Sequence, residues 1–215
     1  MSEFFSFPEG YRSGFACFVG RPNAGKSTLT NALVGRKIVI TSDKPQTTRT
    51  VVRGIVHRGD GQLILVDTPG LHRPRTLLGD LLIGMMPEGP PLYPDGDLTD
   101  APEEILAAEL IREAALDGVR DELPHSIAVV VDEMALREDR PEDKPLLDIS
   151  ASLYVERSSQ KGIMIGHQGA RLRQVGTVAR QQIEALLGTP VYLDLRVKIA
   201  KDWQRDPKQL RKLGF

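Results

Sequence analysis

Residues 20–27 read GRPNAGKS, and this stretch decides the fold expected for the first part of the chain. It follows the apolar run GFACFVG at residues 14–20 and precedes TLTNALV at residues 28–34, whose apolar spacing suits a helix. A strand, a glycine-rich loop and a helix in this order predict a phosphate-binding loop, because glycines let the backbone amides at a helix N-terminus approach an anion. The alternative is a glycine-rich turn with a surface lysine.

The residues of this loop have distinct expected roles. We expect Lys26 to reach the β- and γ-phosphates of a nucleotide and Ser27 to offer its hydroxyl to Mg²⁺. The amides predicted to hold the phosphates belong to Asn23, Ala24, Gly25, Lys26, Ser27 and Thr28.

A second phosphate-associated element is predicted at residues 67–70, DTPG, which follow a nearly continuous apolar strand at residues 62–67. Asp67 occupies the place of an acid that associates with Mg²⁺, usually through water, and the amide of Gly70 is expected to meet the γ-phosphate. Alone, DTPG would be a common turn. Together with the first loop it predicts a sensor of the γ-phosphate.

The polar stretch SDKPQTTRT, residues 42–50, lies between these two elements. We expect either Thr47 or Thr48 to complete the Mg²⁺ shell only when the γ-phosphate is bound, which would switch this segment between order and disorder. The candidate catalytic residues are therefore Lys26, Thr48 and Gly70.

The composition of the chain excludes several classes of protein. The 215 residues hold 40% hydrophobic residues but no apolar run near the ~18 residues that span a bilayer. Cys17 is the only cysteine, so an intramolecular disulfide and a multi-cysteine zinc site are excluded and a reducing cytoplasm is expected. The net charge is +5 over residues 1–82, −12 over residues 83–145 and +6 over residues 146–215, so two basic ends flank an acidic middle.

The remaining chain divides at a proline-rich stretch, residues 85–102, which predicts a linker or a domain boundary. After it we expect a helix over residues 99–122 capped by Thr99 or Asp100. Strands at 126–136 and 146–157, helices through residue 187 and a strand at 190–199 then give the order α-β-β-α-α-β. Trp203 in the basic tail is expected either to stack on a base or, slightly favoured, to anchor the final segment.

The stretch IMIGHQG at residues 163–169 contains a GxxG pattern between two predicted helices. Such a loop can clamp the backbone of about four nucleotides, because its glycines permit close approach to phosphates. The alternative is a mere helix-connecting turn. The candidate RNA-binding residues are Lys161, Ile165, Gly166, His167, Gln168, Gly169, Arg171, Arg173, Lys198, Lys201 and Arg205.

The motifs GRPNAGKST, KPQTTR and DTPG together resemble the small bacterial GTPases of the TrmE-Era group, and the α-β-β-α-α-β half resembles a type II KH domain. The resemblance implies an α/β phosphate-loop GTPase domain, with its N-terminal part at residues 1–82 and its end and linker at 83–98, followed by an α+β KH domain with a basic tail at 99–215. It implies GTP or GDP and Mg²⁺ as ligands. Leu71 stands where Ras-like proteins place a water-orienting glutamine, so slow intrinsic hydrolysis is expected.

The same resemblance implies a partner and a location. Members of the group that carry a KH domain bind the 3′ end of small-subunit ribosomal RNA and assist assembly of the 30S subunit. We accordingly expect a cytoplasmic monomer. Whether its basic tail also contacts lipids at the inner face of the cell membrane stays open.

One departure from the group bears on nucleotide recognition. The guanine-recognising pattern NKxD occurs nowhere in the sequence, because the chain passes from the DTPG region almost directly into the linker, with the join near residues 79–83. A segment is then either omitted from this sequence or deleted from the protein, and we prefer omission. The alternative function is a non-enzymatic KH RNA-binding protein with a remnant nucleotide site.

Overall fold

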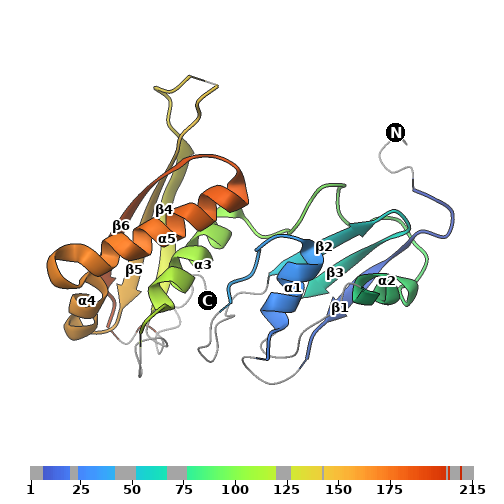
Figure 1. Cartoon of the computed structure of the whole chain (residues 1–215), viewed down its shortest axis with the longest axis horizontal. Helices are drawn as coiled ribbons and strands as arrows, with labels where there is room; N and C mark the ends of the chain where they lie inside the picture. The colour runs from blue at the N-terminus through green and yellow to red at the C-terminus, as the bar shows by residue number, and fades with distance from the viewer. Residues whose placement is uncertain are drawn as a thin grey trace. The chain divides into compact units, whose positions relative to one another are not determined.

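A computed structural model gives the structure of the chain and describes residues 7–19, 24–41, 52–66, 77–119, 127–141 and 143–201, with 203 and 209. It divides the chain into two compact units, Met1–Ala101 and Pro102–Phe215. The elements of both units are labelled in Figure 1.

The first unit is a small sheet with helices on one face. Its described elements are β1 (Arg12–Cys17), α1 (Lys26–Val34), β2 (Arg53–Arg58), β3 (Gly61–Val66) and α2 (Leu77–Gly84). The strand order is β1-β3-β2, with β1 parallel and β2 antiparallel to β3.

The core of this unit lies between the helices and the central strand. Leu63 and Leu65 of β3 pack with Leu29 and Leu33 of α1 and with Ile83 of α2. Because side chains alternate along a strand, Gln62 and Ile64 point to the opposite face, and both are fully buried there. Something other than α1 and α2 therefore covers that face.

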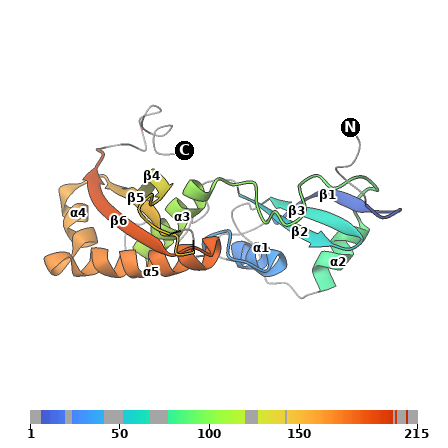
Figure 2. The ribbon, with the colours of Figure 1, turned by 90° about the horizontal axis from the view of Figure 1, so that it is seen from above.

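The cover is a strap, defined here as residues 86–100, which borders both edges of the sheet. At β1 the amide of Ser13 donates to Pro87 O (3.1 Å), and at β2 the amide of Ile55 donates to Leu98 O (2.9 Å). In Figure 2 this segment runs along the strands of the unit. The stretch that the sequence marks as a linker is thus built into the first unit.

Gln62 fastens the strap where it crosses β3. Its Oε1 accepts hydrogen bonds from the amides of Leu92 (2.6 Å) and Tyr93 (2.9 Å), and its Nε2 donates to Tyr93 O (2.9 Å). A buried amide side chain therefore satisfies three backbone groups of an irregular segment, which would otherwise be buried without partners.

The predicted join at residues 79–83 lies within α2, which runs from Leu77 to Gly84, and it stays a prediction. The expected cap of the next helix requires correction. Neither Thr99 nor Asp100 caps α3 (Glu103–Leu116), whose N-cap is Pro102 without a side-chain hydrogen bond. Asp100 is instead engaged by Arg53 Nη1 (2.5 Å) and by the hydroxyl of Tyr93 (3.1 Å).

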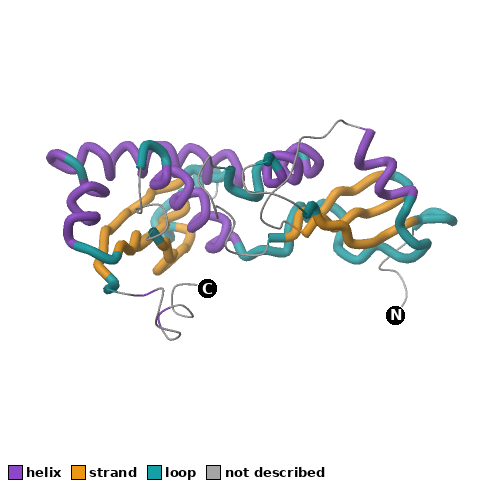
Figure 3. The backbone as a smooth tube through the Cα atoms, turned by 90° about the horizontal axis from the view of Figure 1, so that it is seen from below, coloured by secondary structure: helices purple, strands orange, loops and turns teal. Residues whose placement is uncertain are grey.

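The second unit has the predicted order α-β-β-α-α-β. After α3 come β4 (Ala128–Leu136), β5 (Leu147–Val155), α4 (Ser158–Ile165), the short 3-10 turn His167–Gly169, α5 (Ala170–Leu187) and β6 (Val191–Ile199). The sheet order is β4-β5-β6, with β4 antiparallel and β6 parallel to β5. Figure 3 shows the helices along one face of these strands.

The opposite face of this sheet is partly covered by Trp203. Its side chain is 1% exposed and lies against Ala128, Val130, Tyr154 and Ala200. The expected anchoring role of Trp203 is therefore confirmed.

Replacement of Gln62 tests the role of the strap. Gln62→Leu should leave the amides of Leu92 and Tyr93 without their buried acceptor, at a cost of about 2 kcal/mol. Hydrogen exchange of the β3 amides should show that loss, whereas the exposed substitution Gln181→Leu should leave their exchange unchanged. Equal protection of β3 in wild type and Gln62→Leu would contradict this role.

Candidate functional site

The phosphate loop ends in a left-handed glycine from which α1 begins. Gly25 has φ 92° and ψ 21° and is the N-cap of the helix, without a side-chain capping bond. This backbone conformation favours glycine, since an L side chain there is strained. The first helical bond joins the amide of Leu29 to Gly25 O (2.9 Å), so the amides of Lys26, Ser27 and Thr28 precede the helical ladder.

The side chains of this turn differ in exposure. Lys26 is 3% exposed, whereas Ala24 and Ser27 are half-buried and Thr28 is exposed. Leu29 and Leu33 hold the helix on the sheet, which fixes the direction of its N-terminus. The arrangement is that of an anion-binding helix end with a lysine in its first turn.

Asn31 is a positioning residue that sequence reasoning missed. Its Oδ1 accepts from the amides of Ile38 (2.9 Å) and Val39 (3.0 Å), and its Nδ2 donates to Val39 O (2.7 Å). The helix ends at Gly35 (φ 80°), which lies in sequence between Asn31 and the two residues it binds. In the sequence, the available signal is an asparagine near the end of a helix that is followed by a glycine. In the structure, the Asn31 side chain fixes the position of the backbone at Ile38 and Val39, after the end of the helix.

Several expected residues lie outside the described part of the chain. They are Asn23, Thr47, Thr48, Asp67, Gly70, Leu71 and Arg205. Within the described residues, no group of three or more His, Cys, Asp or Glu could hold a metal ion.

The GxxG loop has the geometry of a tight crossing between α4 and α5. Gly166 and Gly169 have φ of 70° and 76°, and Gln168 is the described non-glycine residue with positive φ (48°). A Cβ added to Gly166 would lie 2.8 Å from Arg171 Cβ and 3.1 Å from its backbone N, so glycine is needed there. His167 and Gln168 are exposed at the tip.

Gly169 is the N-cap of α5 and has no side-chain capping bond. Its amide donates to Gly166 O (3.2 Å), which closes the loop. The exposed tip therefore stands directly before a second helix N-terminus that is left open to an anion.

A groove extends from this loop between α5 and β6. Its cavity volume is about 470 Å³, and its lining includes three leucines and two arginines. The lining residues are Gly169, Leu172, Arg173, Gly176, Thr177, Arg180, Leu193 and Leu195. Sequence reasoning named only Gly169 and Arg173 of this set, although the alternation of Leu193 and Leu195 in β6 was a usable signal.

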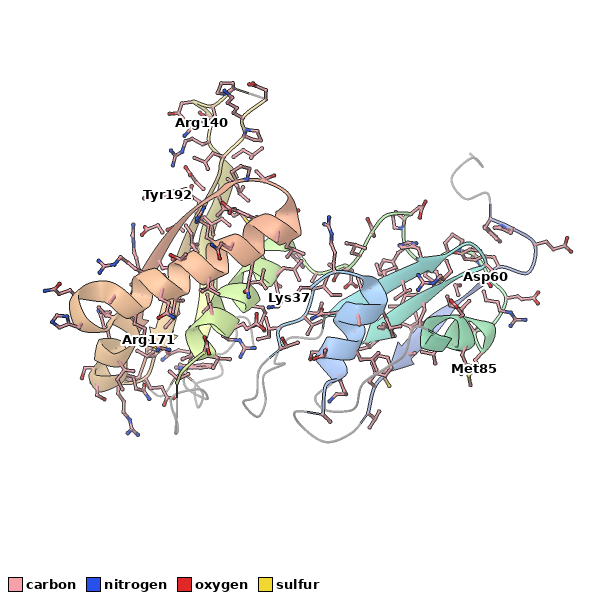
Figure 4. The ribbon with its side chains drawn as sticks, in the orientation of Figure 1. Lys37, Asp60, Met85, Arg140, Arg171 and Tyr192 are labelled. Atoms are coloured by element: carbon pink, nitrogen blue, oxygen red, sulfur yellow. The ribbon has the colours of Figure 1, made fainter. Side chains whose placement is uncertain are left out.

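Arg171 does not point into this groove. Its Nη2 donates to Asp117 O (2.6 Å) and Ala115 O (3.2 Å), which are carbonyls at the C-terminal end of α3. The side chain, labelled in Figure 4, thus ties the first turn of α5 to α3.

Lys198 also lies apart from the loop. Its Nζ is 3.7 Å from Asp132 Oδ2 and 5.8 Å from the centre of the Tyr154 ring. Leu193 and Leu195 line the groove, so the alternation of β6 places Lys198 on the other face of the sheet.

The other expected RNA-binding residues of the described part lie in α4, in α5 or just after β6, and each is half-buried or exposed. Lys161 and Ile165 are half-buried in α4, and Arg173 is exposed on α5. Lys201 is exposed after the end of β6. The structure therefore places Ile165 and Arg173 beside the loop and Lys198 away from it, whereas Arg171 packs on Gly166 but directs its guanidinium to α3.

Comparisons with protein families match both parts of the chain. A family described as 50S ribosome-binding GTPase matches residues 15–152, and the KH domain family matches residues 122–204. A crystal structure of Era in complex with MgGDPNP and nucleotides 1506–1542 of 16S ribosomal RNA matches with a TM-score of 0.85 and 29% identity, over 95% of this chain and 99% of that one.

Two bacterial proteins called GTPase Era are close in sequence. The one from Nocardioides is 57% identical over 302 aligned residues, which cover 95% of this chain and 96% of the relative. The one from Streptomyces coelicolor is 52% identical over 302 aligned residues, with 95% of each chain covered. Because 302 aligned positions exceed the 215 residues of this chain, the relatives contain residues that have no counterpart here. The chain belongs to the Era family of GTPases.

Proposed function

We propose that this chain binds and hydrolyses GTP with Mg²⁺, and that it binds the 3′ end of 16S ribosomal RNA through its KH domain. Its cellular role is assistance in assembling the 30S ribosomal subunit, with the bound nucleotide governing RNA affinity. The observation that carries the proposal is the presence, in one Era-family chain, of two helices that each begin at a left-handed glycine, Gly25 and Gly169.

The nucleotide phosphates are assigned to the first of these helices. The amides of residues 24–28 precede the helical ladder, and Lys26 supplies the positive charge for the β- and γ-phosphates. Asn23 and Gly70 complete the phosphate contacts. Ser27, with Thr47 or Thr48 and with Asp67, forms an oxygen donor set of the kind that Mg²⁺ prefers.

The catalytic contribution of this chain is mainly electrostatic. Mg²⁺, when bound, neutralises charge that develops on the phosphate oxygens. We assign stabilisation of the transferring phosphoryl group to Lys26 and the amide of Gly70, and completion of the Mg²⁺ shell to Thr47 or Thr48. Since Leu71 has no group to orient water, turnover is expected to be slow.

The RNA is assigned to the second helix and to the groove beside it. The backbone of the GxxG loop meets phosphates, and the apolar walls formed by Leu172, Leu193 and Leu195 receive bases. Arg173 adds a phosphate contact at the rim. Lys161, Lys201 and Arg205 supply further positive charge for the phosphates of the same RNA.

We also propose that the chain acts as a cytoplasmic monomer whose basic tail allows peripheral contact with the inner face of the membrane. Among the described residues, none of the helices is long and apolar enough to cross a bilayer. A non-enzymatic RNA-binding protein with a remnant nucleotide site is less well supported, because the chain belongs to a family of GTPases and keeps the left-handed Gly25 before Lys26.

Lys26→Ala tests the nucleotide site. Loss of a charged phosphate contact should weaken GTP binding about 10- to 100-fold and abolish phosphate release. Calorimetry with GTP and Mg²⁺ measures the first effect and a phosphate-release assay the second. Lys144→Ala, an exposed lysine in the second unit, is the matched control. Unchanged GTP affinity in Lys26→Ala would remove this residue from the site.

The double change His167→Asp and Gln168→Asp tests the RNA clamp. Two carboxylates about 4 Å from phosphates should cost about 1 kcal/mol each in water, which lowers RNA affinity about tenfold or more. Fluorescence anisotropy with a 16S 3′-end oligonucleotide measures this. Arg140→Glu changes the net charge equally but lies at the β4–β5 hairpin tip, which extends away from the sheet in Figure 1. If both variants bound RNA like the wild type, the loop would not be the clamp.

A further inference from the structure

Arg171 occupies a position between the GxxG loop and the end of α3. It lies in the first turn of α5, and its Nη2 bridges the carbonyls of Asp117 (2.6 Å) and Ala115 (3.2 Å). Its Nη1 approaches to 3.6 Å from the site of a Cβ at Gly118. The guanidinium is therefore engaged with backbone of α3 rather than directed at the groove.

The end of α3 has a physical need for this contact. The last carbonyls of a helix have no partner within it, and they carry the negative end of the helix dipole. A guanidinium suits such a place because its planar fork can donate to two carbonyls at once while its charge opposes the dipole. An ammonium group could meet only part of this requirement.

The same residue also limits the geometry of the loop. A Cβ at Gly166 would be 2.8 Å from Arg171 Cβ, so the backbone of the first loop glycine lies directly against the start of the Arg171 side chain. One end of Arg171 is thus packed on the loop and the other is hydrogen-bonded to α3. A shift of α5 relative to α3 would move the point against which Gly166 packs.

We propose that Arg171 is a positioning residue of the RNA clamp, which holds the Gly166–Gly169 loop in its binding geometry by fastening α5 to the C-terminal end of α3. The inference rests on the proposed RNA-binding function. It gives Arg171 a role different from the phosphate contact expected from its sequence position beside the loop.

The two roles differ in how RNA binding responds to salt. Each phosphate contact to single-stranded nucleic acid adds about 0.7 to the slope of log affinity against log salt concentration. Arg171→Ala should therefore lower affinity without changing the slope. Arg173→Ala, which removes an exposed arginine two residues away, should lower both.

The experiment uses the full chain and a single-stranded oligonucleotide with the 16S 3′-end sequence, titrated by anisotropy at several salt concentrations. If only about a tenth of the Arg171→Ala molecules hold the loop in its binding conformation, the apparent Kd for RNA rises about tenfold. Arg171→Lys should recover part of the affinity, since an ammonium can still donate to one carbonyl. Arg140→Ala removes the same charge at the hairpin tip and should bind like the wild type.

Hydrogen exchange separates positioning from a general loss of stability. In Arg171→Ala the amide of Gly169, which closes the loop by donating to Gly166 O, should exchange faster while the β5 amides keep their protection. If Arg171→Ala unfolds, Arg171→Gln replaces it, because glutamine keeps an N–H donor for an α3 carbonyl but carries no charge. Weakened binding with an unchanged salt slope in Arg171→Gln supports the proposal, and a reduced slope contradicts it.

Three results would overturn the proposal. A salt slope reduced as much as in Arg173→Ala would make Arg171 a phosphate contact. Affinity equal to that of Arg140→Ala, with unchanged Gly169 exchange, would leave Arg171 without a role in the clamp. Failure of the wild type itself to bind the oligonucleotide would instead refute the proposed RNA-binding function, and the positioning role with it.

Discussion

The close approach of backbone to an anion is the constraint on which both proposed sites depend. Gly25 and Gly169 each take a left-handed conformation immediately before a helix, and neither helix has a side-chain cap at that end. A capping side chain would occupy the amides that a phosphate needs, so the absence of a cap preserves the site at some cost in helix stability. Leu29 and Leu33 pack α1 on its sheet in the first unit, and Arg171 fastens the start of α5 to α3 in the second.

In the first unit, both faces of the three-stranded sheet are covered by other parts of the chain. The helices α1 and α2 cover the face of Leu63 and Leu65. On the opposite face the strap is hydrogen-bonded to Gln62 through the backbone of Leu92 and Tyr93. Proline-rich sequence suits such a strap, because it forms no regular ladder and its backbone groups can be met by a few side chains. The strap also borders β1 and β2, the two edge strands, which limits their pairing with other chains.

Sequence patterns predicted the parts of this structure that depend on local constraints. The strand, loop and helix around Gly25, the GxxG loop and the α-β-β-α-α-β order all follow from glycine positions and apolar periodicity. The directions of long side chains were harder to predict, because they depend on packing between elements distant in sequence. Arg171 follows the loop in the sequence, yet its guanidinium bonds to residues of α3. Lys198 could have been placed correctly, since the alternation of β6 assigns it to the face opposite Leu193 and Leu195.

The two sites belong to one account only if the nucleotide governs RNA binding. A coupling free energy between sites is reciprocal, so the nucleotide must change RNA affinity by the same factor by which RNA changes nucleotide affinity. The most direct measurement is the affinity of the full chain for the 16S 3′-end oligonucleotide with Mg²⁺ and either a non-hydrolysable GTP analogue or GDP, each at saturating concentration. We predict different RNA affinities in the two states. The ratio of these affinities should equal the factor by which bound RNA changes the preference of the chain for the GTP analogue over GDP. Equal RNA affinity in both states would contradict this prediction.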